Sequence, residues 1–533
     1  MIHSNTLAIK RIKFFLVLFS LLFLSLSIDA QNYKVKKIVP SKGKINKQLN
    51  EIKRKQEELH SDSSGIQPKK NTSIDTTVLN RYGDLLNDDP LYNKKYPIWK
   101  PALGVLGANL FVLAADRYLF KYDFATQVGI SSWSHNINTG WEWDTDRFGI
   151  NFVGHPYSGT LSFNAARSNG YNYWQSVPFA IGGSLLWEYF GENTLPSYND
   201  IINTPINGAF LGEIFYRLSS NILDDRSRGN QRFFRELTAG LINPVRGVNR
   251  LLQGKSFRKT NIEVYQKEPL NVTLFGGIHI VNASRGDVNI SPTEGISNPM
   301  FNVQLDYGNP FENRPRKPFD FFKLRVDLNF GVGRKILNNI TGYGILTGKN
   351  YQTKSGNRGM LLGAFQYYDY WDNKTFELGA IGFGGGLITK VLIDKASKSN
   401  LYTSLHLAAV PFAGSSRQFG PDTTQVRDYD FGGGLEGKFE STINVGKRAT
   451  ATMVAYYYWI HNYVGTKEEN FVGILRPRVT IGLFKSLSIG YEHFIYVNDR
   501  FINNLSPTHL LRTEEKIFLL IFLEDNQRRG HYN

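Results

Sequence analysis

The stretch LRVDLNF, residues 324–330, alternates apolar and polar side chains without a break. Successive side chains of a β-strand point to opposite faces, so this stretch predicts a strand with one apolar face and one polar face. Residues 301–307 (FNVQLDY) repeat the pattern, and the runs 435–445 and 487–497 follow it too. In a membrane barrel, we expect Val326, Leu328, Phe330 and Val332 to face lipid, and Arg325, Asp327 and Asn329 to face the lumen.

The length of the alternating runs favours a membrane barrel over a soluble sandwich. Many runs reach about 10–12 residues, which a tilted strand needs to cross a bilayer. Sandwich strands are nearer about 5–6 residues. Tyr and Trp cluster at run ends, in residues 367–371 and 456–459, as in interfacial aromatic girdles. We count about twelve strands between Asn261 and Glu524, with 10 or 14 as alternatives because such barrels have even strand numbers. The prediction is a mainly β protein, a transmembrane antiparallel β-barrel preceded by a helical periplasmic or luminal domain.

The N-terminus predicts export. Lys10, Arg11 and Lys13 precede an apolar stretch at 14–28, and Ala30 offers a small residue for cleavage. This is the layout of a secretory signal peptide, assigned to residues 1–30. The alternative is a membrane anchor, for which about 15 apolar residues are short.

Composition divides the rest of the chain. Residues 31–100 hold 15 Lys or Arg against 8 Asp or Glu, and we interpret 31–95 as a basic disordered tether. An exported chain rarely meets nucleic acid, so we expect no nucleic-acid partner. The helical domain is assigned to 96–258, the barrel to 259–525 and a polar tail to 526–533. The chain has no Cys, which excludes disulfides, thiolate metal sites and a cysteine nucleophile.

In residues 96–258 the spacing of apolar residues changes from the period of strands to that of helices. None of the helices expected there is long and apolar enough to span a bilayer. Residues 139–152 are expected to be extended and could pair with the barrel. The expected helices are Pro101–Tyr118, His155–Asn169, Val177–Phe190, Asn199–Leu223 and Gln231–Leu252, the last interrupted at Pro244.

Polar side chains interrupt these apolar helices and suggest a site. A His and carboxylates in an apolar setting can transfer protons or hold a cation. A lone buried carboxylate is costly unless it is paired, so we expect one histidine and two carboxylates to converge as catalytic residues: His155, Glu188 and Asp200. The accompanying binding candidates share helix faces or bring charge to the same domain; they are Ser158, Arg167, Asn203, Asn207 and Arg217.

Structural roles are the alternative. His155 precedes Pro156 and fits a helix cap or a hydrogen-bonded core His, while Ser197 and Asp200 fit N-terminal caps. Glu188 fits an ion pair with Arg167 or Arg217. Glu213 and Arg217 form an i,i+4 pair. No Gly-x-Ser-x-Gly elbow accompanies Ser158. The sequence by itself assigns no metal and no cofactor.

A set of motifs resembles a known family. They are HPYSG (155–159), ARSNG (166–170), WEYFGE (187–192), PSYNDIINTP (196–205), GAFLGE (208–213), YRLS (216–219) and INPVRGVNR (242–250). They resemble the core of an uncharacterised bacterial outer-membrane family, domain of unknown function 3943, over about residues 95–255. The resemblance implies an outer-membrane setting and no known activity.

A looser pattern is similar to small helical membrane-associated proteins of the VanZ type. Those show a His, a Glu on a later helix, then Ser-x-x-Asp and an Asn before a Gly-Ala turn. The matching positions are His155, Glu188, Ser197, Asp200, Asn203 and the pair at 208–209. One extra residue before Gly208 departs from the pattern.

Three functions are compatible with the sequence. The leading one is an outer-membrane barrel with a helical domain that acts in envelope transport or assembly. The second is an envelope enzyme acting on lipid or cell-wall polymer, and the third is a structural or docking barrel; whether the chain is an enzyme stays open. The expected partners are the lipid bilayer and lipid or cell-wall polymer. The expected location is the cell outer membrane, reached through a cleaved signal peptide.

Overall fold

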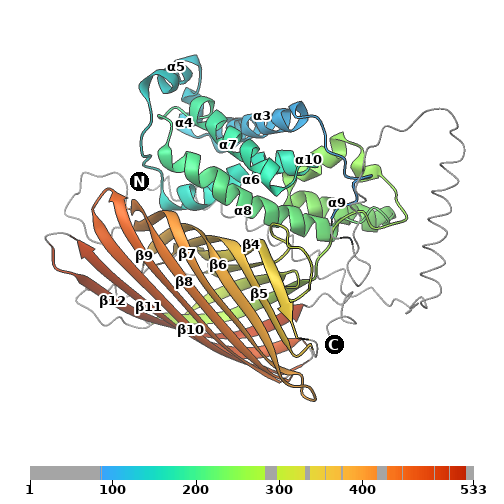
Figure 1. Ribbon diagram of the computed structural model, residues 1–533. Coiled ribbons are helices and arrows are strands. Elements are labelled where there is room, and N and C mark those ends of the chain that lie inside the picture. The colour runs from blue at the N-terminus through green and yellow to red at the C-terminus, as the bar shows by residue number, and fades with distance from the viewer. Residues whose placement is uncertain are drawn as a thin grey trace, which may run out of the picture.

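The computed structural model describes residue 85 and residues 87–281, 297–330, 336–353, 356–373, 376–416, 429–446, 448–484, 486–502 and 505–523. The expected signal peptide, most of the expected tether and the polar tail lie outside these residues. The described residues form a β-barrel with a helical domain lying beside it (Figure 1).

The barrel is closed and its neighbouring strands are antiparallel, in the order β1-β12-β11-β10-β9-β8-β7-β6-β5-β4-β3-β2. The predicted fold and the predicted strand number of 12 are therefore confirmed. Closure leaves no unpaired edge, as a bilayer demands. The strands are β1 Leu270–Val281, β2 Ser297–Tyr307, β3 Phe322–Asn329, β4 Leu337–Gln352, β5 Arg358–Asp372, β6 Glu377–Asp394, β7 Ser399–Ser416, β8 Tyr429–Val445, β9 Ala449–Val464, β10 Glu468–Gly482, β11 Leu487–Ile502 and β12 Thr508–Leu523.

Side chains meet across the lumen of the barrel. Arg476 on β10 forms an ion pair of 3.3 Å with Asp327 on β3. The rings of Trp371 on β5 and Phe494 on β11 lie 6.3 Å apart, although β5 and β11 stand opposite each other in the strand order. Both residues of the ion pair and Trp371 are almost fully buried. The lumen is thus bridged by charged and aromatic side chains at these levels.

The two faces of β3 alternate as predicted, but one face has a different neighbour. Asp327 points into the lumen, where it meets Arg476, and Arg325 and Asn329 share its side of the strand. Val326 and Leu328 point outward, yet they are buried in the same apolar cluster as Phe210 of the helical domain. The expectation that Val326 and Leu328 face lipid is therefore wrong, because helices cover this part of the wall. Phe330 is 41% exposed, and Val332 lies outside the described residues.

The helical domain contains eight α-helices and two π-helical turns among the described residues. Every expected helix is present, with ends shifted by a few residues, and Pro244 separates two helices as predicted. The order is α3 Trp99–Ala114, η1 Ala115–Phe120, α4 Asp123–Gln127, α5 Ile130–Thr139, η2 Ile150–Gly154, α6 His155–Arg167, α7 Tyr173–Phe190, α8 Tyr198–Ile222, α9 Gly229–Ile242 and α10 Pro244–Leu252, followed by a 3-10 turn, η3 Lys255–Phe257.

Local signals account for the helix ends. Asn172 caps α7 by accepting a hydrogen bond from the backbone N–H of Gln175, whose side chain completes a capping box. Asn243 accepts from the N–H of Arg246 at the start of α10. Residues 139–152, expected to be extended and to pair with the barrel, instead make one bridge, between Glu142 and Ser197, before η2 begins. The expected pairing with a barrel strand is wrong.

Glycines allow α6 and α8 to lie in direct backbone contact. A Cβ at Gly159 would lie 2.0 Å from the carbonyl oxygen of Thr204, and one at Gly208 would lie 2.6 Å from the carbonyl carbon of Gly159. Both positions therefore exclude any side chain. The close approach holds His155, one turn before Gly159, beside the first turn of α8.

The helical domain packs on the outward face of the barrel. The hydroxyl of Tyr173 donates to Gln366 on β5 at 2.6 Å, Gln366 donates to the carbonyl of Ile206 at 2.9 Å, and the hydroxyl of Tyr368 donates to the carbonyl of Phe152. Gln366 pairs with Phe383, which is 37% exposed on the outer surface. Helix α8 lies along the wall in Figure 1. The expectation of a luminal domain is wrong for the described helices.

One described helix does reach the length and composition of a membrane span, contrary to expectation. It is the continuous α3–η1 segment Trp99–Phe120, of 22 residues. Most of it is exposed, including Leu103, Leu110 and Phe111. The helix was expected over Pro101–Tyr118, and the continuous segment is longer by two residues at each end.

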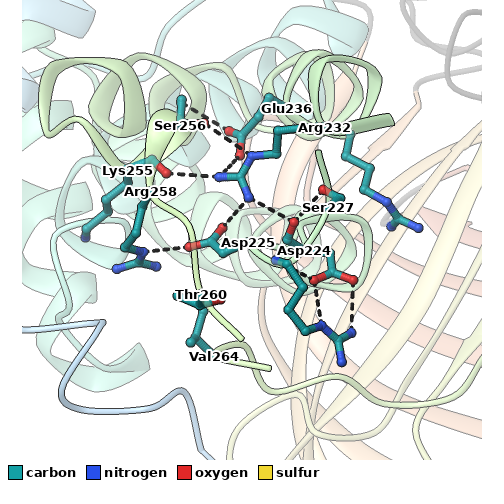
Figure 2. Close-up of polar contacts among 12 residues, drawn as sticks. Asp224, Asp225, Ser227, Arg232, Glu236, Lys255, Ser256, Arg258, Thr260 and Val264 are labelled. Atoms are coloured by element: carbon teal, nitrogen blue, oxygen red, sulfur yellow. Dashed lines mark hydrogen bonds and ion pairs between the residues drawn. The ribbon is translucent and has the colours of Figure 1, made fainter. Parts of the chain in front are cut away.

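An ion-pair network holds together the C-terminal part of the helical domain. Asp225, which is 1% exposed, accepts from Arg258 at 2.6 Å, from Arg232 at 3.0 Å and from Arg250 at 3.2 Å. Figure 2 shows Asp225 between Arg232 and Arg258. These guanidinium groups lower the pKa of Asp225 although burial alone would raise it. The network ties α9, α10 and η3 to the end of α8.

Residues at the end of the expected tether belong to the folded part. Asp88 accepts a hydrogen bond from the hydroxyl of Tyr216 at 2.7 Å and from the backbone N–H of Gln266 at 2.8 Å. Tyr92 packs against the small apolar cluster that includes Val264. The ordered helical domain therefore begins before residue 96.

Candidate functional site

Six polar residues gather where α6 and α8 begin and α7 ends. We call them the carboxylate cluster. His155 opens α6, Glu188 lies in the last turn of α7, and Asp200 lies in the first turn of α8. The other three come from irregular segments that flank these helices. The cluster consists of Asp144, Asp146, His155, Glu188, Glu192 and Asp200, whose charges interact in the structure.

His155 is at the centre of the cluster. It is 7% exposed, and its Nε2 lies 3.4 Å from Oδ2 of Asp146 and 3.7 Å from Oδ1 of Asp200. The predicted convergence of His155 and Asp200 is confirmed as a geometry. The same imidazole nitrogen faces two carboxylates, so it can carry a proton between them or be a ligand of a cation that they share.

Glu188 is almost fully buried and is held by the backbone. Its Oε2 accepts a hydrogen bond of 2.7 Å from the N–H of Ser197, and its charge interacts with those of His155 and Glu192. The expected pairing with Arg167 or Arg217 is wrong, because both arginines bind Glu213 instead. Arg167 Nε lies 2.7 Å from Glu213 and Arg217 Nε lies 2.8 Å from it.

Glu192 lies in the loop after α7, four residues beyond Glu188. Trp187 donates its indole N–H to Glu192 at 2.6 Å. Burial raises the pKa of Glu192 to about 7; the charge of His155 opposes this rise, and Asp146 and Asp144 add to it. A carboxyl group with a pKa near neutrality can both accept and donate a proton at physiological pH.

Asp200 is the least satisfied carboxylate of the cluster. It is 0% exposed, and neither side-chain oxygen has a hydrogen-bond partner among the described residues. The predicted capping role is therefore wrong for its side chain. Ser197 does occupy the N-cap position of α8, but its side chain makes no capping bond. A buried carboxylate without a donor is costly, which marks Asp200 as a group that needs a proton or a cation.

Three of these residues have the spacing of metal ligands. One ligand atom each from Asp144, His155 and Asp200 lies within 4.8 Å of the others. Asn151 positions Asp144 by donating to its Oδ1 at 2.8 Å, and Asn199 accepts the N–H of Asp144 at 3.1 Å. These hydrogen bonds fix the orientation of the Asp144 carboxylate, as hydrogen bonds to the ligands do at metal sites.

The predicted binding residues separate into three groups. Asn203 donates to the carbonyl of Asn151 and so joins α8 to η2, and Asn207 donates to Asn203 at 2.7 Å within α8. Arg167 and Arg217 lie at the Glu213 ion pair and are not in the cluster. Ser158 is half-buried one turn after His155, and among the described residues it makes no hydrogen bond to the cluster.

Sequence reasoning missed Asp144, Asp146 and Glu192. Asp144 and Asp146 lie in the segment that was expected to be a strand, where an alternating acidic pair is unremarkable. Glu192 follows Glu188 at i+4, which would place both on one helix face, but the helix was expected to end at Phe190. The Asp-x-Asp spacing beside a buried His was the available signal.

Aromatic side chains adjoin the cluster in the chain, because Trp143 precedes Asp144 and Tyr198 lies two residues before Asp200. Ring centroids lie 5.8 Å apart for Trp141 and Tyr198, 5.7 Å for Trp143 and Tyr198, and 6.2 Å for Trp143 and Tyr463 of β9. We call these four residues the aromatic rim. Tyr198 and Tyr463 are nearly half exposed. The rim lies where the helical domain meets the ends of β8 and β9, because Trp143 also contacts Phe431 at 5.0 Å.

Comparisons with solved structures give only weak likenesses to barrels. The NanC porin is 7% identical, with 47% of this chain and 98% of that chain covered and a TM-score of 0.26. The outer membrane channel DcaP of Acinetobacter baumannii is 7% identical, with 48% and 97% covered and a TM-score of 0.24. The Pseudomonas putida toluene transporter TodX is 8% identical, with 49% and 89% covered and a TM-score of 0.21. No curated protein matches the chain.

The family comparison concerns the helical domain. A family model described as domain of unknown function 3943 matches residues 140–245. This range contains the whole carboxylate cluster and the contact between α6 and α8, so the resemblance drawn from the motifs is confirmed. The VanZ-like pattern stays a prediction. The match to domain of unknown function 3943 thus covers residues 140–245, which precede a closed twelve-stranded barrel.

Proposed function

We propose that the chain spans the outer membrane with its barrel, and that its helical domain is an enzyme acting on an envelope lipid or lipid-linked polymer. The carboxylate cluster is its active site. The observation that carries the proposal is the buried, incompletely paired cluster in the helical domain, which packs on the outer wall of the barrel.

The membrane location follows from the distribution of polar groups. Leu407 and Leu435 are exposed on the outward face at 67% and 54%, whereas charged residues such as Lys516 and Arg476 are buried in the lumen. This is the reverse of a soluble protein and typical of a barrel in lipid. Trp and Tyr favour the boundary between lipid and water, and the aromatic rim supports a position of the cluster near that boundary.

The helical domain also exposes large apolar side chains. Leu110 and Phe111 on α3 are 56% and 72% exposed, and Trp174 on α7 is 58% exposed. Because the helices replace lipid along part of the wall, their outer faces contact lipid in turn. A substrate with an acyl chain can reach the cluster from this side, which favours a lipid or lipid-linked substrate.

The cluster differs from an internal ion pair in its charge balance. Glu213 has two guanidinium partners, whereas Asp200 has only His155 as an ion-pair partner among the described residues. Glu188 and Glu192 are the groups that we assign to proton transfer. His155 and Asp200 hold the reacting group or an ion that polarises it.

The test uses the purified full chain in vesicles made from an outer-membrane lipid extract. We expect the wild type to change at least one lipid or glycolipid species in mass spectra, and Glu188→Gln to lose that change while keeping the heat-modifiable migration of a folded barrel. Asp123→Asn, an exposed carboxylate on α4, is the matched control and should remain active. Spectra that are identical for wild type and boiled protein, and an unaltered envelope in a deletion strain, would refute the enzyme.

Transport through the lumen is the second candidate. The luminal face carries polar side chains, and a cavity of about 20 Å³ lies among Lys323, Arg325, Lys438 and Glu440, which is space for about one water molecule. The Trp371–Phe494 contact would have to open for a solute to pass. The test is conductance in planar bilayers. A measurable conductance of the wild type, and a higher one of Trp371→Ala, would favour transport over the enzyme.

A further inference from the structure

We propose that the carboxylate cluster binds one divalent transition-metal ion, with Zn²⁺ as the best-matched probe, through Asp144, His155 and Asp200. This inference deepens the proposed function by naming the ion that its site takes. It rests on the geometry of the three side chains and does not require the enzyme to be active.

The first argument is geometric. The three ligand atoms lie within 4.8 Å of one another and come from separate segments that converge at the starts of α6 and α8. Ligands of one Zn²⁺ lie about 2.0–2.2 Å from the ion, so a shift of the order of 1 Å brings all three into its shell. Asp146, whose Oδ2 is 3.4 Å from the His155 Nε2, is near enough to contribute a fourth oxygen.

The second argument is the state of Asp200. Its side chain is 0% exposed, and both of its oxygens lack a hydrogen-bond donor among the described residues. Its neighbour His155 has one nitrogen directed at two carboxylates. A cation between these groups satisfies the orphan oxygens and neutralises charge that the buried site otherwise has to accommodate by taking up protons.

The third argument concerns the kind of ion. A neutral imidazole nitrogen with carboxylate oxygens suits Zn²⁺, whereas Ca²⁺ and Mg²⁺ prefer shells of oxygen alone. The site also has the supporting contacts that tune metal ligands. Asn151 donates to Asp144, and the hydroxyl of Tyr429 on β8 donates to the carbonyl of Asp146 at 2.7 Å. The barrel therefore helps to fix the ligand loop.

The test is calorimetric titration of the EDTA-treated full chain in detergent with Zn²⁺ alone. We expect one ion per chain with a clear preference over Mg²⁺ and Ca²⁺. Asp200→Asn keeps the side-chain shape and should weaken the affinity at least about 100-fold, and His155→Gln should do the same. The exposed Asp123→Asn variant is the control and should bind as the wild type does.

The outcomes separate this inference from the proposed function. Zn²⁺ binding by the wild type that is unchanged in Asp200→Asn and His155→Gln, or no binding at all, overturns the metal site whatever the lipid assay shows. Metal binding without any lipid change refutes only the enzyme. If Asp200→Asn does not fold, Asp144→Asn replaces it, because Asp144 is half-buried and lies in a loop; unchanged affinity in that variant also overturns the site.

Discussion

Replacing Gly159 with Ala tests the contact that brings His155 next to Asp200. The added Cβ would lie 2.0 Å from the Thr204 carbonyl oxygen and 3.2 Å from the Gly208 Cα. An ordinary contact needs 3.4 Å, so α8 has to move away from α6 by about 1.4 Å at this point. Backbone atoms on both sides cannot rotate out of the way, and a packed interior transmits such strain.

The size of the effect follows from two opposing quantities. Ala is favoured over Gly inside a helix by about 1 kcal/mol, whereas overpacking costs about 1–3 kcal/mol and more where backbone is displaced. We therefore expect a net loss of about 2 kcal/mol in the stability of the helical domain. For a unit of this size that corresponds to a fall of about 4–8 °C in Tm.

The measurement is thermal unfolding of the full chain followed by circular dichroism at 222 nm. Gly182→Ala on α7 is the matched control, because a Cβ there meets nothing within 4 Å, and it should raise the Tm slightly. The displacement should also weaken Zn²⁺ binding in Gly159→Ala, since His155 and Asp200 lie on the two helices that separate. A Gly159→Ala variant as stable as Gly182→Ala would refute the packing of α6 on α8.

Three further changes probe other parts of the molecule. Leu407→Arg, at an outward position that is 67% exposed, should cost about 2–4 kcal/mol near the bilayer midplane and reduce the heat-modifiable folded form in vesicles; equal folding yields would argue against a lipid-facing wall. Glu192 has a folded-state pKa of about 7, above its ordinary value, so the folded chain holds more protons than the unfolded one and stability should fall as pH rises to about 7. Glu192→Gln should flatten this dependence in melts across that pH range, and parallel profiles would contradict the assignment. Asp225→Asn leaves the guanidinium groups of its network without their shared charge, and should cost about 3–5 kcal/mol in urea unfolding of the helical domain; a loss below about 1 kcal/mol would show that other groups hold the network.

The parts of the fold that local patterns specify were predictable. A period of two fixes which side chains of β3 share a face, whatever the strand packs against, and this placed Asp327 in the lumen correctly. The break between α9 and α10 followed from Pro244, which acts on its own backbone, whereas the cap Asn172 was overlooked and the start of α7 was expected four residues late. The number of strands followed from counting such runs, because each turn interrupts the period.

Only some residues of the carboxylate cluster could be predicted from the sequence. Three residues stood out because each interrupts or borders an apolar helix, and a buried charge has to be paired or hydrogen-bonded: His155, Glu188 and Asp200. Asp144 and Asp146 gave no such contrast, since they belong to an irregular polar segment. Their place beside His155 depends on how residues 140–154 turn back over α8, for instance through the bridge between Glu142 and Ser197.

Only the tertiary structure decided what covers the apolar surfaces. Val326 is apolar and outward-facing, and nothing in the sequence distinguishes a side chain that meets lipid from one that meets Phe210, because both neighbours are hydrocarbon. The i,i+4 pair of Glu213 with Arg217 was predicted and is present, whereas the second partner, Arg167, reaches Glu213 from another helix, and such a pair depends on distance in space. Periodicity and local hydrogen bonding therefore determined the elements of this protein and the direction of their faces, whereas the contacts between faces were decided by the packing of the complete chain.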